Sequence, residues 1–235
     1  MMRYANILPG VFHSRPNRFV AMVEPEGEPL QAVHVKNTGR CRELLTPGAA
    51  VWLEQSPNPN RKTRYSLVAV QKGSLLINMD SQAPNKAAGV WLAAHPLTEN
   101  GQLPVKIKPE YTFGKSRLDF CLEYADGSRT LVEVKGVTLE RDGVLYFPDA
   151  PTQRGIKHLE ELAAALDDRT RAAILFVAQM KGPRLFRPNI ETHPRFAAAL
   201  AAAAQAGVQV LCMDCVVTPQ SMVLDAPVAV ELAQP

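Results

Sequence analysis

The sequence predicts an α+β protein in which a small five-stranded β-barrel precedes a mixed α/β domain. Turn residues divide roughly the first 80 residues into short apolar segments, and after them helical and strand periodicities alternate. A chain of 235 residues can build two small cores. We place the boundary in the turn-rich stretch DSQAPNK, which divides the chain into a barrel domain, 1–83, and an α/β domain, 84–235.

The composition is that of an ordinary globular protein. Hydrophobic residues make up 46% of the chain and charged residues 21%. No apolar run approaches the length of a membrane span, and the N-terminus lacks the continuous apolar core of a secretion signal. We therefore expect a cytoplasmic protein with no membrane partner.

The barrel is predicted from five apolar segments separated by turn signals such as EPEGEP, TPG and SPNPN. Five short strands in this length suggest the oligonucleotide-binding (OB) type of barrel. A short helix over 38–45 is expected between the second and third strands. The strands are RFVAMVE (18–24), QAVHV (31–35), AAVWLEQ (49–55), RYSLVAV (64–70) and SLLIN (74–78).

The second part alternates helices and strands in a way that predicts a sheet covered by helices on both faces. One helix, TQRGIKHLEELAAAL, carries Ile156, Leu159, Leu162 and Leu166 along one side. The predicted order is a helix over 84–97, strands over 105–113, 116–124, 129–137 and 144–149, a helix over 152–166, a strand over 172–180, a helix over 193–207 and a strand over 208–213.

The strand TLVEVKGVTL places an acid and a base inside an apolar run. Side chains alternate along a strand, so Glu133 and Lys135 point to the same face. Burying an unpaired charge is costly. These two side chains must therefore be paired, hydrated or bound to a ligand.

A third charge, Asp119, comes from the preceding strand. A three-residue loop, Ala125 to Gly127, would place Asp119 opposite Glu133, with the two Cβ atoms about 5 Å apart. A two-residue loop would shift the register by one, and we favour the first because it clusters the charges.

Two carboxylates at this separation suit a hard divalent cation, Mg²⁺ or Mn²⁺, and the neighbouring lysine could hold a water or a phosphate oxygen. The alternative is a buried salt bridge in an ordinary sheet. Three charges in the order D-x13-E-x-K favour a site.

Asp119 with Glu133-Val134-Lys135 resembles the PD-(D/E)xK nuclease motif. Longer segments resemble the sugar fermentation stimulation protein A family, and the likeness runs from about Arg15 to about Gly207. One departure is Cys41, where the family has a larger apolar residue. The segments are HVKNTGRCRELLTPG (34–48), SPNPNRKTRYSL (56–67), GKSRLDF (114–120), VEVKGVTL (132–139) and FPDAPTQRGIKHLEEL (147–162).

The resemblance implies an OB barrel followed by a restriction-endonuclease-like αβββαβ domain. It also implies DNA binding without strong sequence preference and a regulatory role in bacterial sugar metabolism, maltose in particular. Asp119, Glu133 and Lys135 would be catalytic, with the two carboxylates as metal ligands, and Gln153 resembles a glutamine that supports the metal in some nucleases of this fold. Two functions stay open: a DNA-binding regulator, and a working Mg²⁺-dependent nuclease acting on DNA or RNA.

Basic side chains are the predicted phosphate contacts, and a solvated surface is the alternative. Residues 1–85 hold ten Lys/Arg and six Asp/Glu, and the rest of the chain holds sixteen and seventeen. In the helix over 152–166, Arg154 and Lys157 lie near an N-terminus that suits phosphate. In the barrel the candidates are Lys36, Arg40, Arg42, Arg61, Lys62 and Arg64.

Three further expectations concern aromatic, histidine and cysteine residues. Phe19 and Trp52 are expected to fill the barrel, which favours recognition of the nucleic-acid backbone over base stacking. His158 has no identifiable partner, and we expect it at the surface or in a supporting contact. For Cys212 and Cys215 buried free thiols are favoured over a redox or half-zinc motif.

Overall fold

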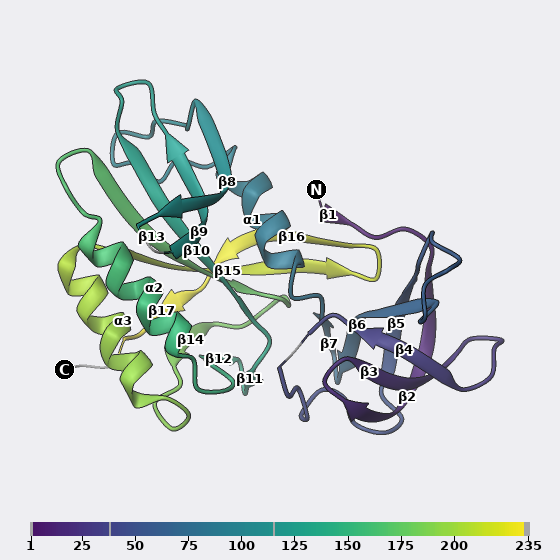
Figure 1. Ribbon diagram of the computed structural model, residues 1–235. Helices are drawn as coiled ribbons and strands as arrows, with labels where there is room; N and C mark the ends of the chain where they lie inside the picture. Colours follow the sequence, from purple (N-terminus) through teal and green to yellow (C-terminus); the bar gives the residue numbers. More distant parts are fainter. Residues whose placement is uncertain (1, 38, 115, 233–235) are drawn as a thin grey trace.

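The computed structural model describes residues 2–37, 39–114 and 116–232. Thr38 and Lys115, which fall within segments singled out above, lie outside the described residues. The chain forms a barrel and a larger α/β part, which lie side by side in Figure 1 with the barrel in purple and blue. Strands and helices together therefore follow the predicted α+β order.

Five strands close the N-terminal barrel. β3 and β5 flank β2, β6 pairs with β5, and a parallel pairing of β4 with β6 completes the ring. Closure leaves no free edge among these five strands. The OB-type barrel is confirmed. Its strands are β2 (Ile7–Asn17), β3 (Val20–Pro25), β4 (Gln31–Val35), β5 (Ala50–Gln55) and β6 (Tyr65–Lys72), and β7 (Leu75–Asn78) extends the sheet beyond β6.

The predicted set of five strands was wrong in one member, because it counted β7 and omitted β2. The strand contains Pro9, Gly10 and Pro16, which are residue types that usually interrupt strands, yet it runs for eleven residues. The register of the β2–β3 pairing shifts twice beyond Phe12. Such bulges are places where a sheet tolerates proline. A Cβ on Gly10 would lie 3.0 Å from the Glu24 carbonyl oxygen, so glycine permits the close strand contact.

Two other expectations for the barrel were wrong. No α-helix forms within the described part of 38–45: the amides of Leu44 and Leu45 close one turn on the Cys41 carbonyl, and Cys41 has a positive φ of 45°. Phe19 is 55% exposed, and Trp52 is half-buried against the cluster around α1. Phe12 and Tyr65 are the aromatic residues of the barrel core.

A seven-stranded mixed sheet forms the second part, in the order β1-β16-β15-β13-β10-β9-β8. Its central strands β10, β13 and β15 are parallel. The strands are β1 (Met2–Arg3), β8 (Lys106–Phe113), β9 (Ser116–Glu123), β10 (Arg129–Val137), β13 (Thr170–Ala178), β15 (Gln209–Thr218) and β16 (Ser221–Pro227). A smaller sheet holds β11 (Glu140–Arg141), β12 (Val144–Phe147), β14 (Leu185–Pro188) and β17 (Ala229–Val230).

Helices cover both faces of this sheet, as predicted. α1 (Ala83–Leu92) packs on the face of Val132 and Val134, and α2 (Gln153–Ala164) and α3 (Pro194–Ala206) pack on the other. The Thr152 hydroxyl caps α2 by accepting the Gly155 amide at 3.0 Å, and Gly207 ends α3 with a φ of 110°. Within the described residues, no helix is long and apolar enough to cross a bilayer.

The C-terminal part of the chain forms more strands than its sequence pattern predicted. β15 is not the last strand, because β16 and β17 follow it, and β14 also lay outside the predicted set. β1 pairs with β16, so Met2 and Arg3 join the sheet of the second part. The division of the chain at residue 83 stays a prediction.

Buried polar contacts join the barrel to the α/β part. Gln179, at the end of β13, donates from its side chain to the Asn78 carbonyl at 2.9 Å, and its own carbonyl accepts the Asn78 amide at 2.8 Å. Lys72 of the barrel contacts Glu140 through both the carboxylate (2.9 Å) and the carbonyl (2.8 Å). Because the two parts bury these polar groups against each other, the contacts hold the two parts in one arrangement.

Glu140→Gln is expected to destabilise the protein at neutral pH and not in acid. Burial raises the pKa of Glu140, but the Gly143 amide and the Lys72 ammonium outweigh it and hold the pKa below its ordinary value. A lowered acid pKa stabilises the fold at neutral pH, and this stability is lost as the pH falls below about 4. Urea unfolding should show a loss of about 1–2 kcal/mol at pH 7 that shrinks in acid.

The control for this experiment is Glu191→Gln, which changes an exposed partner of Arg141 and should stay within about 0.5 kcal/mol of the wild type at every pH. A Glu140→Gln deficit that is equal at pH 7 and pH 3 would contradict the assignment of the stabilisation to the ionised carboxylate.

Candidate functional site

The β9–β10 hairpin has the predicted register. Glu123 pairs with Arg129 and Phe120 with Val132, and Gly127 takes the positive φ, 78°, that the three-residue loop requires. This result excludes the two-residue loop.

The ladder ends at the pair of Phe120 with Val132, so Asp119 does not form the predicted ladder pair with Glu133. Its Oδ2 accepts the Val134 backbone amide at 2.7 Å and its Oδ1 accepts the Asn85 side-chain amide at 2.6 Å. The side-chain alternation changes here, because Leu118 packs with the cluster of Cys121 whereas Phe120 packs on the α1 side. The bend places the carboxylate beside β10, held by a strand amide and by α1.

Glu133 is the centre of a buried charge cluster. Its side chain is 3% exposed, and its Oε1 accepts hydrogen bonds from the Lys135 ammonium and from Nδ1 of His158 on α2. Oε2 is buried and has no hydrogen-bond partner among the described residues. One carboxylate oxygen is therefore fully paired and the other is unsatisfied.

His158 links the polar face of α2 to this cluster. Arg154 donates from Nε to the Nε2 atom of His158 at 3.3 Å, so Nε2 is the acceptor and Nδ1 carries the proton that Glu133 receives. Of the two places expected for His158, the surface is wrong, since the residue is 3% exposed, and the supporting contact is the one observed. Its sequence neighbours on the helix, exposed Lys157 and buried Leu159, could not distinguish the two positions.

The pKa values of the two carboxyl groups shift in opposite directions. Burial, together with the nearby negative charge of Glu133, raises the pKa of Asp119 above its ordinary value. Burial also raises the pKa of Glu133, but the His158 hydrogen bond and the Lys135 charge outweigh it and leave the pKa below its ordinary value.

The other residues predicted on α2 lie at its surface. Gln153 is exposed in the first turn and its side chain makes no hydrogen bond to another described residue, so its supporting role stays a prediction. Lys157 is exposed and lies 3.6 Å from Glu161. Arg154 is exposed but donates the hydrogen bond to His158 described above.

The barrel cations fall into two groups. Lys36 contacts Glu54 and Asp80, Arg64 contacts Glu28, and Arg61 donates to the Ser66 hydroxyl, so these three have protein partners. The remaining three side chains are exposed and have no ion pair among the described residues: Arg40, Arg42 and Lys62.

Arg15 was not among the predicted residues, although it binds the backbone of one of them, Arg40. Its guanidinium donates to the carbonyls of Arg18, Asn37, Gly39 and Arg40 at 2.6–2.9 Å. A Cβ on Gly39 would lie 2.6 Å from Oδ2 of Asp149, so Gly39 touches the segment that leads into α2. No sequence signal separates Arg15 from the other arginines.

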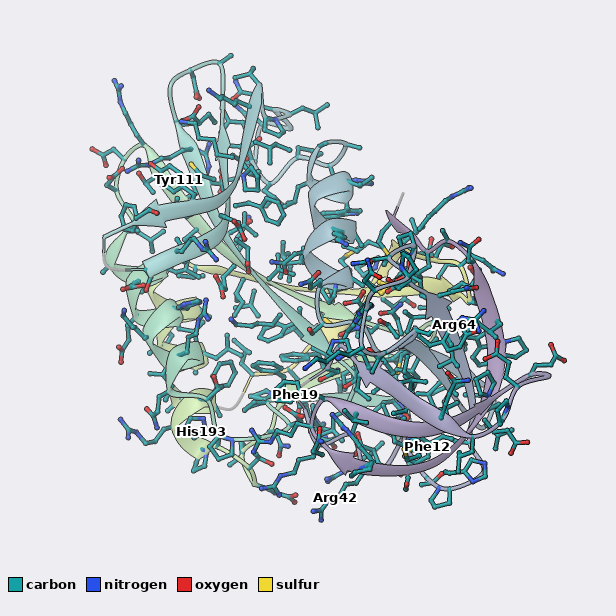
Figure 2. All side chains as sticks on the ribbon, turned by 45° about the vertical axis from the view of Figure 1, so that its right-hand side comes forward. Phe12, Phe19, Arg42, Arg64, Tyr111 and His193 are labelled. Carbon is teal, nitrogen blue, oxygen red and sulfur yellow. The ribbon has the colours of Figure 1, made fainter. Side chains whose placement is uncertain are left out.

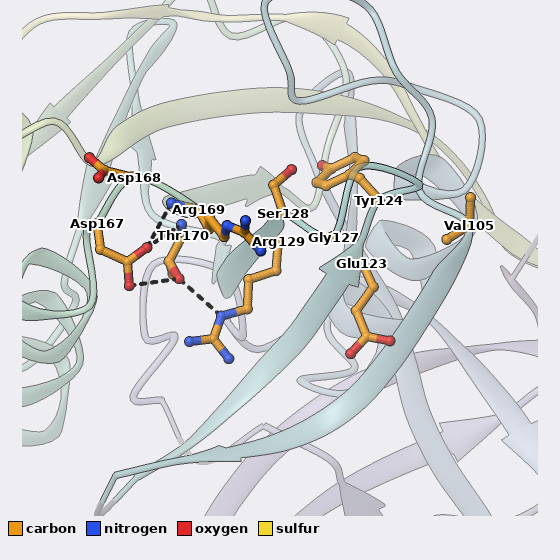
Figure 3. Close-up of a pocket in the computed structure, with 10 residues that line it drawn as sticks. All are labelled: Val105, Glu123, Tyr124, Gly127, Ser128, Arg129, Asp167, Asp168, Arg169 and Thr170. Carbon is orange, nitrogen blue, oxygen red and sulfur yellow. Dashed lines mark hydrogen bonds between the residues drawn. The ribbon is translucent and has the colours of Figure 1, made fainter.

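A cavity of about 780 Å³ lies away from the charge cluster. Figure 3 shows its lining at the start of β10 and β13, where Asp167 receives the Thr170 hydroxyl and Arg129 donates to Thr170. Asp167 also accepts the backbone amides of Arg169 and Thr170, which accounts for its conformation. These contacts stabilise a loop, and none involves Glu133.

All four cysteines are buried and free, which confirms the expectation for Cys212 and Cys215. Cys212 packs in the core under α2 and α3, and Cys215 packs in the core under α1. Because the two thiols of the C-x-x-C sequence lie on opposite faces of the sheet, they cannot share one ion.

Two family models match the chain, the "SfsA N-terminal OB domain" over residues 14–79 and the "Sugar fermentation stimulation protein RE domain" over residues 82–221. The chain belongs to the sugar fermentation stimulation protein family. This result confirms the resemblance drawn from the sequence, and with it the fold class, an OB barrel followed by a restriction-endonuclease-like domain.

Relatives in this family cover almost the whole chain. A sugar fermentation stimulation protein homolog of Desulfitobacterium hafniense strain Y51 is 50% identical over 99% of this chain and 100% of its own length. A homolog of Alkaliphilus oremlandii is 48% identical over 95% of this chain and 96% of its own length. The solved structure of Pyrococcus furiosus SfsA in complex with Ca²⁺ has a TM-score of 0.84 at 28% identity, with 98% of both chains covered.

Proposed function

We propose that this family member binds nucleic acid through its basic surface, without strong sequence preference, and hydrolyses phosphodiester bonds at Asp119, Glu133 and Lys135 with a divalent cation. The observation that carries the proposal is Glu133 Oε2, a buried carboxylate oxygen without a partner among the described residues. An unsatisfied buried anion is costly, so the fold tolerates it best where a ligand completes it.

The donor set fits a hard cation such as Mg²⁺ or Mn²⁺. Asp119 and Glu133 supply carboxylate oxygens, and the Ca²⁺ complex of the Pyrococcus furiosus relative supports a divalent ion. Among the described residues no three acidic, cysteine or histidine side chains converge as a complete metal site, so backbone oxygen, water or phosphate would supply the other ligands. When bound, the ion would activate a water molecule and stabilise the charge that develops on the phosphate.

The chain's own residues have separable roles in this proposal. Lys135 orients a water or holds a phosphate oxygen, which fits its position 16% exposed at the edge of the buried cluster. His158 positions Glu133, and Asn85 positions Asp119. Arg40, Arg42 and Lys62 hold the phosphate backbone, with Arg154 and Lys157 continuing the contact onto α2.

The test is a cleavage assay on single-stranded DNA, double-stranded DNA and RNA, with Mg²⁺ or Mn²⁺ and with a chelator. We expect cleavage that the chelator abolishes and that Lys135→Ala lowers by about 100-fold or more. Binding measured in chelator should survive Lys135→Ala and weaken steeply with salt. Lys108→Ala, which removes a partly exposed lysine paired with Glu123 on the neighbouring strands, is the matched control.

A second candidate is a DNA-binding protein that regulates sugar metabolism, maltose use in particular, without cleaving DNA. The pairing of Glu133 Oε1 with both Lys135 and His158 favours it, because these contacts stabilise the carboxylate without an ion. Binding by the wild type with no cleavage under any metal condition would reject the first candidate and favour this one.

A further inference from the structure

The barrel carries an exposed aromatic side chain where its surface turns toward the α/β domain. Phe19 is 55% exposed and is not among the residues packed on either core cluster. Figure 2 shows it on the side of the barrel that faces the second domain, and Figure 1 places the β2–β3 connection on the same side. The ring therefore contributes to a surface and not to the barrel core.

The backbone under this ring is fixed. The Phe19 amide donates to Oδ1 of Asn17 at 2.9 Å, and the Phe19 carbonyl accepts the Val35 amide at 2.8 Å. A ring on a fixed backbone loses little conformational freedom when it stacks on a ligand.

Arg15 brings the backbones of two arginines, Arg18 and Arg40, together next to Phe19. Its guanidinium joins the carbonyl of Arg18, which precedes Phe19, to the carbonyls of Asn37 and Arg40. The side chains of Arg18 and Arg40 are exposed and have no ion pair among the described residues. An exposed aromatic ring on a surface that also carries exposed arginines matches a nucleotide, which has an aromatic base and an anionic phosphate.

We infer that Phe19 stacks on an unpaired base of a single-stranded nucleic acid whose phosphates contact Arg18 and Arg40. The inference deepens the proposed function, since it rests on nucleic-acid binding and adds the strand class. A duplex keeps its bases stacked and paired, so a protruding ring has a partner only where the strand is single. The contact of Gly39 with Asp149 leads the same surface toward α2.

The experiment measures fluorescence anisotropy of an end-labelled single strand and of its duplex in chelator, so that cleavage does not contribute. Phe19→Ala should weaken single-strand binding about tenfold and change duplex binding less than about twofold. Phe19→Trp should retain single-strand binding, and its indole fluorescence should be quenched by the strand. An abasic strand should bind the wild type and Phe19→Ala equally.

Leu30→Ala is the matched control, because Leu30 is an exposed apolar barrel residue of similar exposure, 49%, and should leave both affinities unchanged. Equal single-strand affinity for wild type and Phe19→Ala, or an equal loss on single strand and duplex, would overturn the inference. Neither result touches the cleavage proposal, which is decided with metal present. If the wild type binds no strand, both fail together.

Discussion

Glu133→Gln is expected to lower metal-dependent cleavage by on the order of a thousandfold while the protein stays folded. The substitution keeps the side-chain volume and removes the negative charge that the Lys135 ammonium, His158 and the proposed cation share. A neutral amide binds a cation much more weakly than a carboxylate does. The substitution should therefore lower the rate of the chemical step.

The matched control for this prediction is Glu123→Gln, the same chemical change on β9, where Glu123 is 35% exposed and pairs with Lys108. Its cleavage rate should stay within about twofold of the wild type. Circular dichroism and thermal unfolding of Glu133→Gln separate lost chemistry from lost fold. Undiminished cleavage by a folded Glu133→Gln protein would reject the site.

Phe176→Ala is expected to cost about 3–5 kcal/mol of unfolding free energy, the largest stability effect among the changes considered. Phe176 is fully buried on β13, and its ring lies 4.1 Å from that of Phe186 and 5.5 Å from that of Phe147. Removing the ring leaves a cavity among rings that cannot close over it, because Phe147 also packs on Phe196 of α3.

Phe19→Ala makes the same chemical change at the barrel surface and should alter the unfolding free energy by less than about 0.5 kcal/mol. Denaturant titration of both variants gives the comparison directly. The pair also tests the reading of Phe19, since a cost of several kcal/mol there would mean that the ring supports the fold. Phe176 pairs in register with Lys135, so its loss should also reduce cleavage.

The two strongest catalytic predictions, Glu133 and Lys135, required only the alternation of side chains along one strand, because a period of two puts them on one face. The hairpin register was chosen because it clusters the charges, and Gly127 supplies the positive φ that the three-residue loop needs. His158 lay beyond this local logic. Its partner is 25 residues away in the chain, and only the packing of α2 on the sheet brings Nδ1 to Glu133.

β2 shows a similar limit. Its prolines and glycine carry a local signal for a break, and tertiary pairing with β3 and β5 overrides that signal. The wrong expectation that Phe19 fills the barrel has the same cause. When the strand partners of a segment are unknown, its sequence does not show which face is buried.

By itself the sequence determined the family, the α+β order of elements, the closed hairpin turn and the residue types of the charge cluster. These depend on periodicity, turn chemistry and motif spacing, all of which act within a short stretch of chain. Tertiary structure alone decided which oxygen of Glu133 is unsatisfied, that Asn85 and His158 hold the two acids, and that Phe19 faces outward. Each of these depends on contacts between segments far apart in the chain, where burial and pairing outweigh local preference.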